Sequence, residues 1–253
     1  MRHHVPVSHR FLFLASRPED EVADDEYASL LRLGGLREDE LVRVRMEAGP
    51  LPDIDLDAVT GVVLGGSPFT SSIPHSRKSA TQRRVEAELE PVLAEVLERD
   101  MPFLGICYGV GSMGMVAGGV VDSTYREDTG PVTVTLTGAG LADDVARALP
   151  PSFDAFVGHT EAFRFPPPGA AVLAGSATCP VQLLRLRRNV YITQFHPEMS
   201  HASLTVRIRA YKHHGYFAPE TAEHLIAGTA GVDVSAAHAL IPAWLEHARR
   251  AGG

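Results

Sequence analysis

The chain has a cysteine in a setting suited to nucleophilic chemistry. The run Gly-Ile-Cys-Tyr-Gly at 105–109 places Cys107 between two glycines, directly after the apolar stretch 103–106. This pattern predicts a buried strand that turns sharply into a helix, because glycines let two backbone segments approach closely. The thiol would then sit at a helix N-terminus, where free N–H groups favour the thiolate. Such a cysteine could attack a carbonyl carbon, and the alternative is a buried structural cysteine.

A histidine and a glutamate follow a second predicted strand. Residues 191–195 are mostly apolar and lead into His196-Pro197-Glu198. Side chains two residues apart in an extended chain point the same way, so His196 and Glu198 can meet on one side. An imidazole in that place could take the thiol proton while the carboxylate holds the ring. The alternative is a surface turn, since the chain contains 12 histidines.

The third segment is a strand that runs into two glycines. Residues 61–64 are followed by Gly65, Gly66 and Ser67. Backbone N–H groups in such a turn are free to face a ligand oxygen. We expect the N–H of Gly66 to form half of an oxyanion hole and the N–H of Tyr108 the other half. Strand–Gly-Gly turns are also common structural features.

The elements that position these segments alternate along the chain in an α/β pattern. Strands are predicted at 11–16, 42–46, 61–64, 103–106, 131–137, 153–157, 171–173, 181–186 and 190–195. Helices are predicted from Asp24 to Gly34-Gly35, over 79–99, from Cys107 to Ala117, and over 204–211 and 219–250. Pro91 predicts a kink or a break in the second helix.

We predict one domain over residues 1–215 and a helical extension, packed on the same domain, over 216–253. Three roles stay open for the extension: a homodimer interface, a partner dock or a cap on the sheet. The N-terminal apolar run, 11–15, is too short for a signal peptide.

Composition narrows the classes of function. The chain has 253 residues and a formal net charge of −8, which does not favour nucleic acid as a partner. Two cysteines suit a reducing compartment better than a disulfide scaffold, and no stretch approaches the roughly 20 apolar residues of a membrane span. We therefore expect a cytoplasmic protein without membrane association. No Cys/His cluster suggests a metal, and we expect no cofactor.

Taken in this order, the three segments resemble the class I glutamine amidotransferase family, in particular its guanosine monophosphate synthetase branch. The similarity spans about residues 59–199, and Gly118-Gly119-Val120 and Gly158-His159-Thr160-Glu161 resemble two further family segments. The resemblance implies a three-layer α/β/α (flavodoxin-like) domain with a central mixed, mostly parallel sheet. It also implies a Cys-His-Glu triad that hydrolyses the side-chain amide of glutamine without a cofactor or metal.

Carried over residue by residue, the resemblance assigns the nucleophile to Cys107, the base to His196 and the orienting acid to Glu198. Gly66 and Tyr108 match the oxyanion donors. Gly65, Thr160 and Glu161 fall where the family binds its substrate.

The chain departs from the family at the substrate side. Gly111 stands where the family has a glutamine that helps to bind substrate, Glu161 stands where aspartate is usual, and Ser67 is an extra residue before Pro68. These departures leave a second substrate class open, another γ-glutamyl amide or peptide. A non-catalytic regulatory module on the same fold is a third alternative.

The chain also lacks two nucleotide-binding loops. Neither a G-x-x-x-x-G-K-[ST] loop nor the Ser-Gly-Gly-x-Asp-Ser loop of the family's synthetase domain occurs in it. We therefore expect the enzyme that consumes the ammonia to be a separate polypeptide.

Overall fold

The computed structural model describes residues 10–213 and 218–252, which form eleven strands and seven α-helices. The strands are β1 (Phe11–Ala15), β2 (Leu41–Arg45), β3 (Gly61–Leu64), β4 (Phe103–Ile106), β5 (Val120–Asp122), β6 (Glu127–Leu136), β7 (Ser152–His159), β8 (Ala162–Phe165), β9 (Ala171–Gly175), β10 (Leu183–Leu186) and β11 (Val190–Thr193). The helices are α1 (Asp20–Gly34), α2 (Ala80–Glu98), α3 (Tyr108–Val116), α4 (Gly138–Ala142), α5 (His201–Ala210), α6 (Ala222–Thr229) and α7 (Leu240–Ala251).

One mixed sheet of nine strands organises the fold, in the order β2-β1-β3-β4-β11-β10-β9-β6-β7. The five strands from β2 to β11 run parallel, and the remaining four pair antiparallel. Strands β5 and β8 form a separate small sheet. In parallel α/β sheets the functional groups gather beyond the carboxyl ends of the strands. Strands β1, β3, β4 and β11 all point to one such edge.

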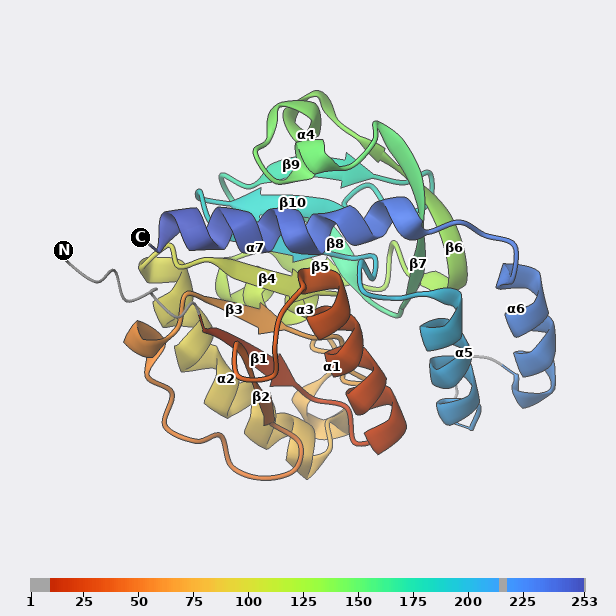
Figure 1. Ribbon diagram of the computed structural model, residues 1–253. Helices are drawn as coiled ribbons and strands as arrows, with labels where there is room; N and C mark the ends of the chain where they lie inside the picture. Colours follow the sequence, from red (N-terminus) through yellow and green to blue (C-terminus); the bar gives the residue numbers. More distant parts are fainter. Residues whose placement is uncertain (1–9, 214–217, 253) are drawn as a thin grey trace.

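Helices cover both faces of the parallel part, which confirms the predicted α/β/α layers. Figure 1 shows α1 and α7 crossing one face while α2 and α3 lie on the other. The alternation of β1 explains this, because Phe11 and Phe13 face the first layer and Leu12 and Leu14 face the second. In the described residues no helix is long and apolar enough to cross a membrane.

The C-terminal helices pack on the same domain. The α7 residue Trp244 is fully buried against Phe11, with ring centroids 5.9 Å apart. Helices α5 and α6 form a smaller apolar cluster with Phe156 on β7. The predicted boundary at 215/216 lies outside the described residues, and this division of the chain stays a prediction.

Two predicted helix features differ from the structure. Helix α1 begins at Asp20 with Glu19 as N-cap, so the predicted start at Asp24 is wrong. Helix α2 is continuous through Pro91, so no break occurs there. Pro91 lies on the exposed side of α2, where water can replace the hydrogen bond that proline cannot make.

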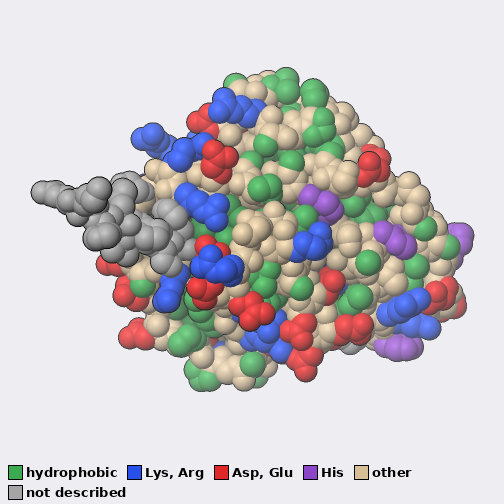
Figure 2. Space-filling model, in the orientation of Figure 1, with side chains coloured by type: hydrophobic (Ala, Val, Ile, Leu, Met, Phe, Trp, Pro, Cys, Tyr) green, Lys and Arg blue, Asp and Glu red, His purple; other side chains and the backbone are tan. Residues whose placement is uncertain are grey.

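Charged side chains are interspersed on the face shown in Figure 2, where acidic and basic groups alternate over α1 and its neighbours. Much of this pattern consists of ion pairs between elements, such as Arg43 with Asp24 and Arg45 with Asp20. These pairs join β2 to α1.

Candidate active site

Cys107 occupies the sharp turn between β4 and α3. Its backbone angles are φ 53° and ψ −70°, a conformation that costs about 1–3 kcal/mol for a residue with a side chain. The Cys107 N–H donates to the Thr193 carbonyl at 2.8 Å, which ties the turn to the end of β11. A Cβ on Gly105 would lie 2.9 Å from the Gly109 Cα, so the flanking glycine is needed for close approach. The predicted strand-to-helix turn is confirmed.

His196 and Glu198 lie together beyond the end of β11. The His196 Nδ1 and Glu198 Oε1 atoms are 2.8 Å apart, and both residues are buried. The His196 N–H donates to the Phe156 carbonyl at 3.0 Å, which fixes the loop against β7. The pair predicted from the spacing of the two residues is therefore formed.

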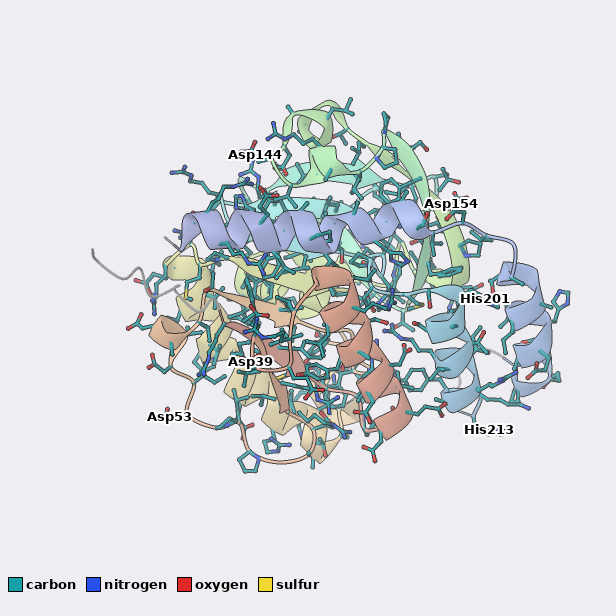
Figure 3. The ribbon with its side chains drawn as sticks, viewed as in Figure 1. Asp39, Asp53, Asp144, Asp154, His201 and His213 are labelled. Carbon is teal, nitrogen blue, oxygen red and sulfur yellow. The ribbon has the colours of Figure 1, made fainter. Side chains whose placement is uncertain are left out.

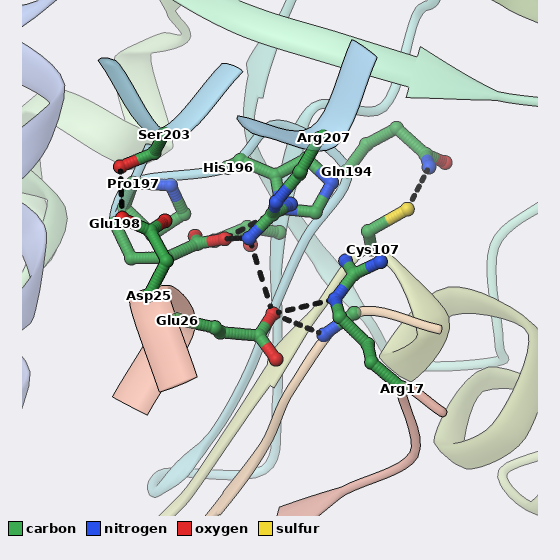
Figure 4. Close-up of polar contacts among 12 residues, drawn as sticks. Arg17, Asp25, Glu26, Cys107, Gln194, His196, Pro197, Glu198, Ser203 and Arg207 are labelled. Atoms are coloured by element: carbon green, nitrogen blue, oxygen red, sulfur yellow. Dashed lines mark hydrogen bonds and ion pairs between the residues drawn. The ribbon is translucent and has the colours of Figure 1, made fainter. Parts of the chain in front are cut away.

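The thiol and the imidazole share one pocket but are not hydrogen-bonded to each other. Cys107 and His196 both line a pocket of about 60 Å³. Among the described residues, the hydrogen bond to the thiol sulfur comes from Gln194 Nε2 at 3.9 Å (Figure 4). A rotation about the cysteine χ1 is the short route from this orientation to the imidazole.

A cluster of four buried charges lies beside this pair. Arg207 on α5 donates to Glu198 Oε1 at 2.7 Å and to Glu26 Oε1 at 3.3 Å, and its Nη1 lies 3.0 Å from His196 Nδ1. Arg17, just after β1, donates to the same Glu26 oxygen at 3.3 Å. Figure 4 shows Glu26 between the two guanidinium groups. Burial makes any unpaired charge here costly, so the cluster holds its members in place.

The position of Glu26 changes the predicted oxyanion hole. The Gly66 N–H donates to Glu26 Oε1 at 3.1 Å, so in this structure it is not free to face a ligand. The Tyr108 N–H belongs to the first turn of α3, whose N–H groups have no partner within the helix. Of the two predicted donors, only Tyr108 is available in this arrangement.

Burial dominates the acid–base properties of the pocket. It raises the pKa of the Cys107 thiol to about 12, although Arg17 and Arg207 act in the opposite direction. The helix N-terminus therefore does not produce a resting thiolate, contrary to the expectation from the sequence. Burial also lowers the pKa of His196, and Arg207 lowers it further while Glu198 raises it. His196 is thus a neutral base at pH 7.

Arg207 gives a pH-dependent prediction. Replacing it with methionine removes one of the two charges that lower the pKa of His196, so that pKa should rise. Because only the neutral imidazole can accept the thiol proton, the acid limb of the pH profile of kcat/KM should move to higher pH. Arg209→Met, which changes an exposed arginine on the same helix, is the matched control. An acid limb that stays in place or moves to lower pH would contradict this role.

Glu161 and Gly111 occupy the predicted substrate side together. The Glu161 carboxylate accepts the N–H of Ser71 at 2.9 Å and of Ser72 at 2.7 Å. A Cβ on Gly111 would clash with Glu161 Oε1 and lie 2.6 Å from Ser71 Oγ. The glutamate side chain therefore fills the space that a larger residue at position 111 would need. Thr160 joins the same loops through its hydroxyl, 3.0 Å from that of Thr70.

Gly65 has a packing role that its position explains. A Cβ there would lie 2.8 Å from Phe13 Cε2 and 2.9 Å from Glu26 Oε2. Gly65 does not line the pocket that holds the thiol. A contact between Gly65 and substrate stays a prediction.

A second polar cluster, which the sequence did not reveal, supports the turn at Thr160. Ligand-type atoms of Glu127, His159 and Cys179 lie within 4.8 Å of one another, in a group that could hold a metal ion. The Glu127 carboxylate, however, already contacts His159 Nε2 at 2.8 Å and Gln182 Nε2 at 2.7 Å, as well as two hydroxyls. The other ring nitrogen of His159 lies 2.9 Å from the Glu161 carbonyl. We interpret the cluster as a hydrogen-bonded support for the loop.

The histidines outside these clusters do not converge. Figure 3 shows His201 at the start of α5 and His213 beyond its other end. The His201 ring is hydrogen-bonded to the Ile226 carbonyl at 3.0 Å. Neither residue forms part of a ligand group within the part of the chain that the structure describes.

A cysteine on a strand-to-helix turn, beside a buried His–Glu pair at the carboxyl edge of an α/β sheet, is an arrangement that can perform acyl transfer. The sequence model of the family "Glutamine amidotransferase class-I" matches residues 38–210. The chain belongs to this family.

Relatives of known name agree with the assignment. A GMP synthase [glutamine-hydrolyzing] of Pasteurella multocida is 30% identical over 148 residues, which are 56% of this chain but 26% of that protein. One separate subunit of the GMP synthase [glutamine-hydrolyzing] of Ignicoccus hospitalis is 32% identical over 60% of this chain and 73% of its own length. The chain thus matches about a quarter of the first relative and nearly three quarters of the second.

The fold recurs in a solved structure. A glutamine amidotransferase of Thermotoga maritima has a TM-score of 0.77 and 18% identity, with coverage of 96% of this chain and 98% of that one. This likeness supports the α/β architecture.

Proposed function

We propose that this chain hydrolyses the side-chain amide of glutamine through a thioester on Cys107 and supplies ammonia to a separate acceptor enzyme. The observation that supports the proposal best is the buried His196–Glu198 pair, 2.8 Å apart, in the same pocket as the cysteine. Family membership supports glutamine as the substrate. The similarity to a GMP synthase component that is a polypeptide of its own supports an acceptor enzyme on another chain.

The reaction begins with proton transfer. The pKa of the Cys107 thiol lies at about 12, so His196 removes the proton as the sulfur attacks the γ-carbonyl carbon. A carbon–sulfur bond forms, and the carbonyl π electrons move onto oxygen. The Tyr108 N–H donates to this oxyanion. Glu198 stabilises the imidazolium and keeps its Nδ1 proton directed away from the sulfur.

The second half of the reaction returns the enzyme to its starting state. The imidazolium protonates the departing nitrogen, the carbon–nitrogen bond breaks and ammonia leaves. Water then attacks the γ-glutamyl thioester, again with His196 as base, and glutamate is released.

A different γ-glutamyl compound is a second candidate substrate. The observation that favours it is the Glu161 carboxylate in the space beside Gly111, where the family places a glutamine. The same nucleophile and base would cleave a γ-glutamyl amide or peptide. A comparison of initial rates on glutamine and on γ-glutamyl amines separates the two substrates.

Glutamate release tests the proposal directly. Wild type should release glutamate from glutamine, alone or with an acceptor enzyme present, and Cys107→Ala should show only the background rate. Iodoacetamide labelling of Cys107 and Cys179 is the companion measurement, because a non-catalytic module should show no faster labelling at Cys107. Equal background rates for both proteins on glutamine and on γ-glutamyl amines would overturn the proposal. A homodimer in solution stays a separate prediction.

A further inference from the structure

The oxyanion site has lost one of its expected donors. The Gly66 N–H is committed to the Glu26 carboxylate at 3.1 Å. Freeing this N–H would leave an oxygen of a buried carboxylate without one of its donors, which is costly. A tetrahedral intermediate on Cys107 therefore needs a donor besides the Tyr108 N–H.

Arg17 lies where such a donor is required. It follows β1 at the carboxyl edge of the sheet and lines the pocket that contains Cys107 and His196. A Cβ on Gly66 would clash with Arg17 Nη2 and lie 2.8 Å from His196 Cε1. The Arg17 nitrogen thus occupies the open side of Gly66, next to the base.

The rest of the Arg17 side chain is held firmly. Its Nε donates to Glu26 Oε1 at 3.3 Å and its Nη1 donates to the Tyr211 hydroxyl at 2.9 Å. Among the described residues, no hydrogen bond is made by Nη2. Two of the three guanidinium nitrogens therefore fix the plane of the group, and the third keeps its N–H groups for a ligand.

The charge of Arg17 reaches the thiol. Burial alone would lower the pKa of Arg17, but Glu26 and Tyr211 raise it well above its ordinary value, so the group stays charged. Arg17 is also the strongest of the influences that oppose the effect of burial on Cys107. A fixed positive charge in a buried pocket is worth more than the same charge in water.

We propose that Arg17 is a catalytic residue whose Nη2 donates to the carbonyl oxygen of the substrate as that oxygen becomes negative. The inference rests on the proposed function and deepens it. The carbon–sulfur bond forms, the π electron pair moves onto oxygen, and Arg17 and the Tyr108 N–H hold this oxygen. On collapse the pair re-forms the carbonyl, and ammonia leaves with the proton from His196. In this arrangement Gly66 provides room for the guanidinium.

The first test separates transition-state from ground-state effects. Arg17→Met should lower kcat by about 10²–10³-fold with KM within threefold, because the donor acts mainly on the transition state. Arg17→Lys keeps a positive charge and should retain more activity. Arg43→Met, at an arginine that pairs with Asp24 on the far side of α1, should leave kcat unchanged. Thermal unfolding of each variant identifies any loss that comes from misfolding.

A second readout does not depend on turnover. The aldehyde 5-oxopentanoate adds to a thiol, with carbon–sulfur bond formation and transfer of the thiol proton to oxygen, to give a tetrahedral adduct. Its affinity, measured as protection of Cys107 from iodoacetamide, should fall at least tenfold in Arg17→Met and remain unchanged in Arg43→Met.

The outcomes distinguish this inference from the proposed function. If wild type and Cys107→Ala both lack activity, the proposed function fails, and the aldehyde affinity alone decides the role of Arg17. A folded Arg17→Met variant that keeps wild-type kcat, or that loses only KM, would overturn the inference. So would equal aldehyde affinities in wild type and Arg17→Met.

Discussion

His196→Ala should lower kcat for amide hydrolysis by about 10²–10⁴-fold, the usual contribution of a positioned general base. Burial raises the pKa of the Cys107 thiol to about 12, so at neutral pH very little thiolate exists without a base. The imidazole lies in the same pocket and is held by Glu198 at 2.8 Å. Steady-state kinetics at pH 7–8 measures the effect, with KM expected to change much less than kcat.

The pH dependence provides the check on this first prediction. In His196→Ala the residual rate should increase steadily with pH, because hydroxide then has to generate the thiolate. His224→Ala changes an exposed histidine on α6 and serves as the control with wild-type kinetics. A folded His196→Ala protein with wild-type kcat would show that another group takes the thiol proton.

Gly111→Gln should reduce kcat/KM for glutamine by about 10²-fold or more, although glutamine is the residue that the family has at this position. The new Cβ would clash with Glu161 Oε1 and lie 2.7 Å from Ser71 Cβ, so one of the two substrate loops must move. A displacement of about 1 Å near the reacting groups can cost about 10²-fold in rate.

Glu161→Asp should rescue the Gly111→Gln variant in part, because the shorter side chain vacates the contested space. The four proteins of this double-mutant cycle, compared by kcat/KM and by thermal unfolding, give the coupling between the two positions. We expect the double variant to be more active than Gly111→Gln alone. Losses that simply add would contradict the view that Glu161 takes up the space at Gly111.

The chemistry-bearing turns could be predicted from the sequence because their signals are local. The glycines beside Cys107 and the spacing of His196 and Glu198 are patterns within a few residues, and the structure shows the turn and the His–Glu pair. The α/β class also follows from the alternation of elements along the chain. These features need no knowledge of what packs against them.

The buried charge cluster could not be predicted, because distant segments build it. Arg17 and Glu26 lie far before Glu198 and Arg207 in the chain, and Glu26 belongs to a helix whose acidic residues are typical of a solvated face. The one usable signal was the place of Arg17, directly after a buried strand whose carboxyl end faces the site. The Gly66 donor was wrongly expected to be free for the same reason, since its partner Glu26 comes from α1.

The support of the Thr160 loop was hidden in a similar way. Glu127, His159 and Cys179 come from separate strands and loops, and none has neighbours that suggest a cluster. Proximity in the sheet brings them together.

The most direct test of the central claim is covalent labelling with a glutamine-like chloroketone, followed by peptide mass analysis. We expect stoichiometric modification of Cys107, slowed by glutamine or by the true γ-glutamyl substrate and absent in Cys107→Ala, with Cys179 unmodified. Labelling of Cys107 that no γ-glutamyl compound slows, or labelling at Cys179 in its place, would contradict the claim.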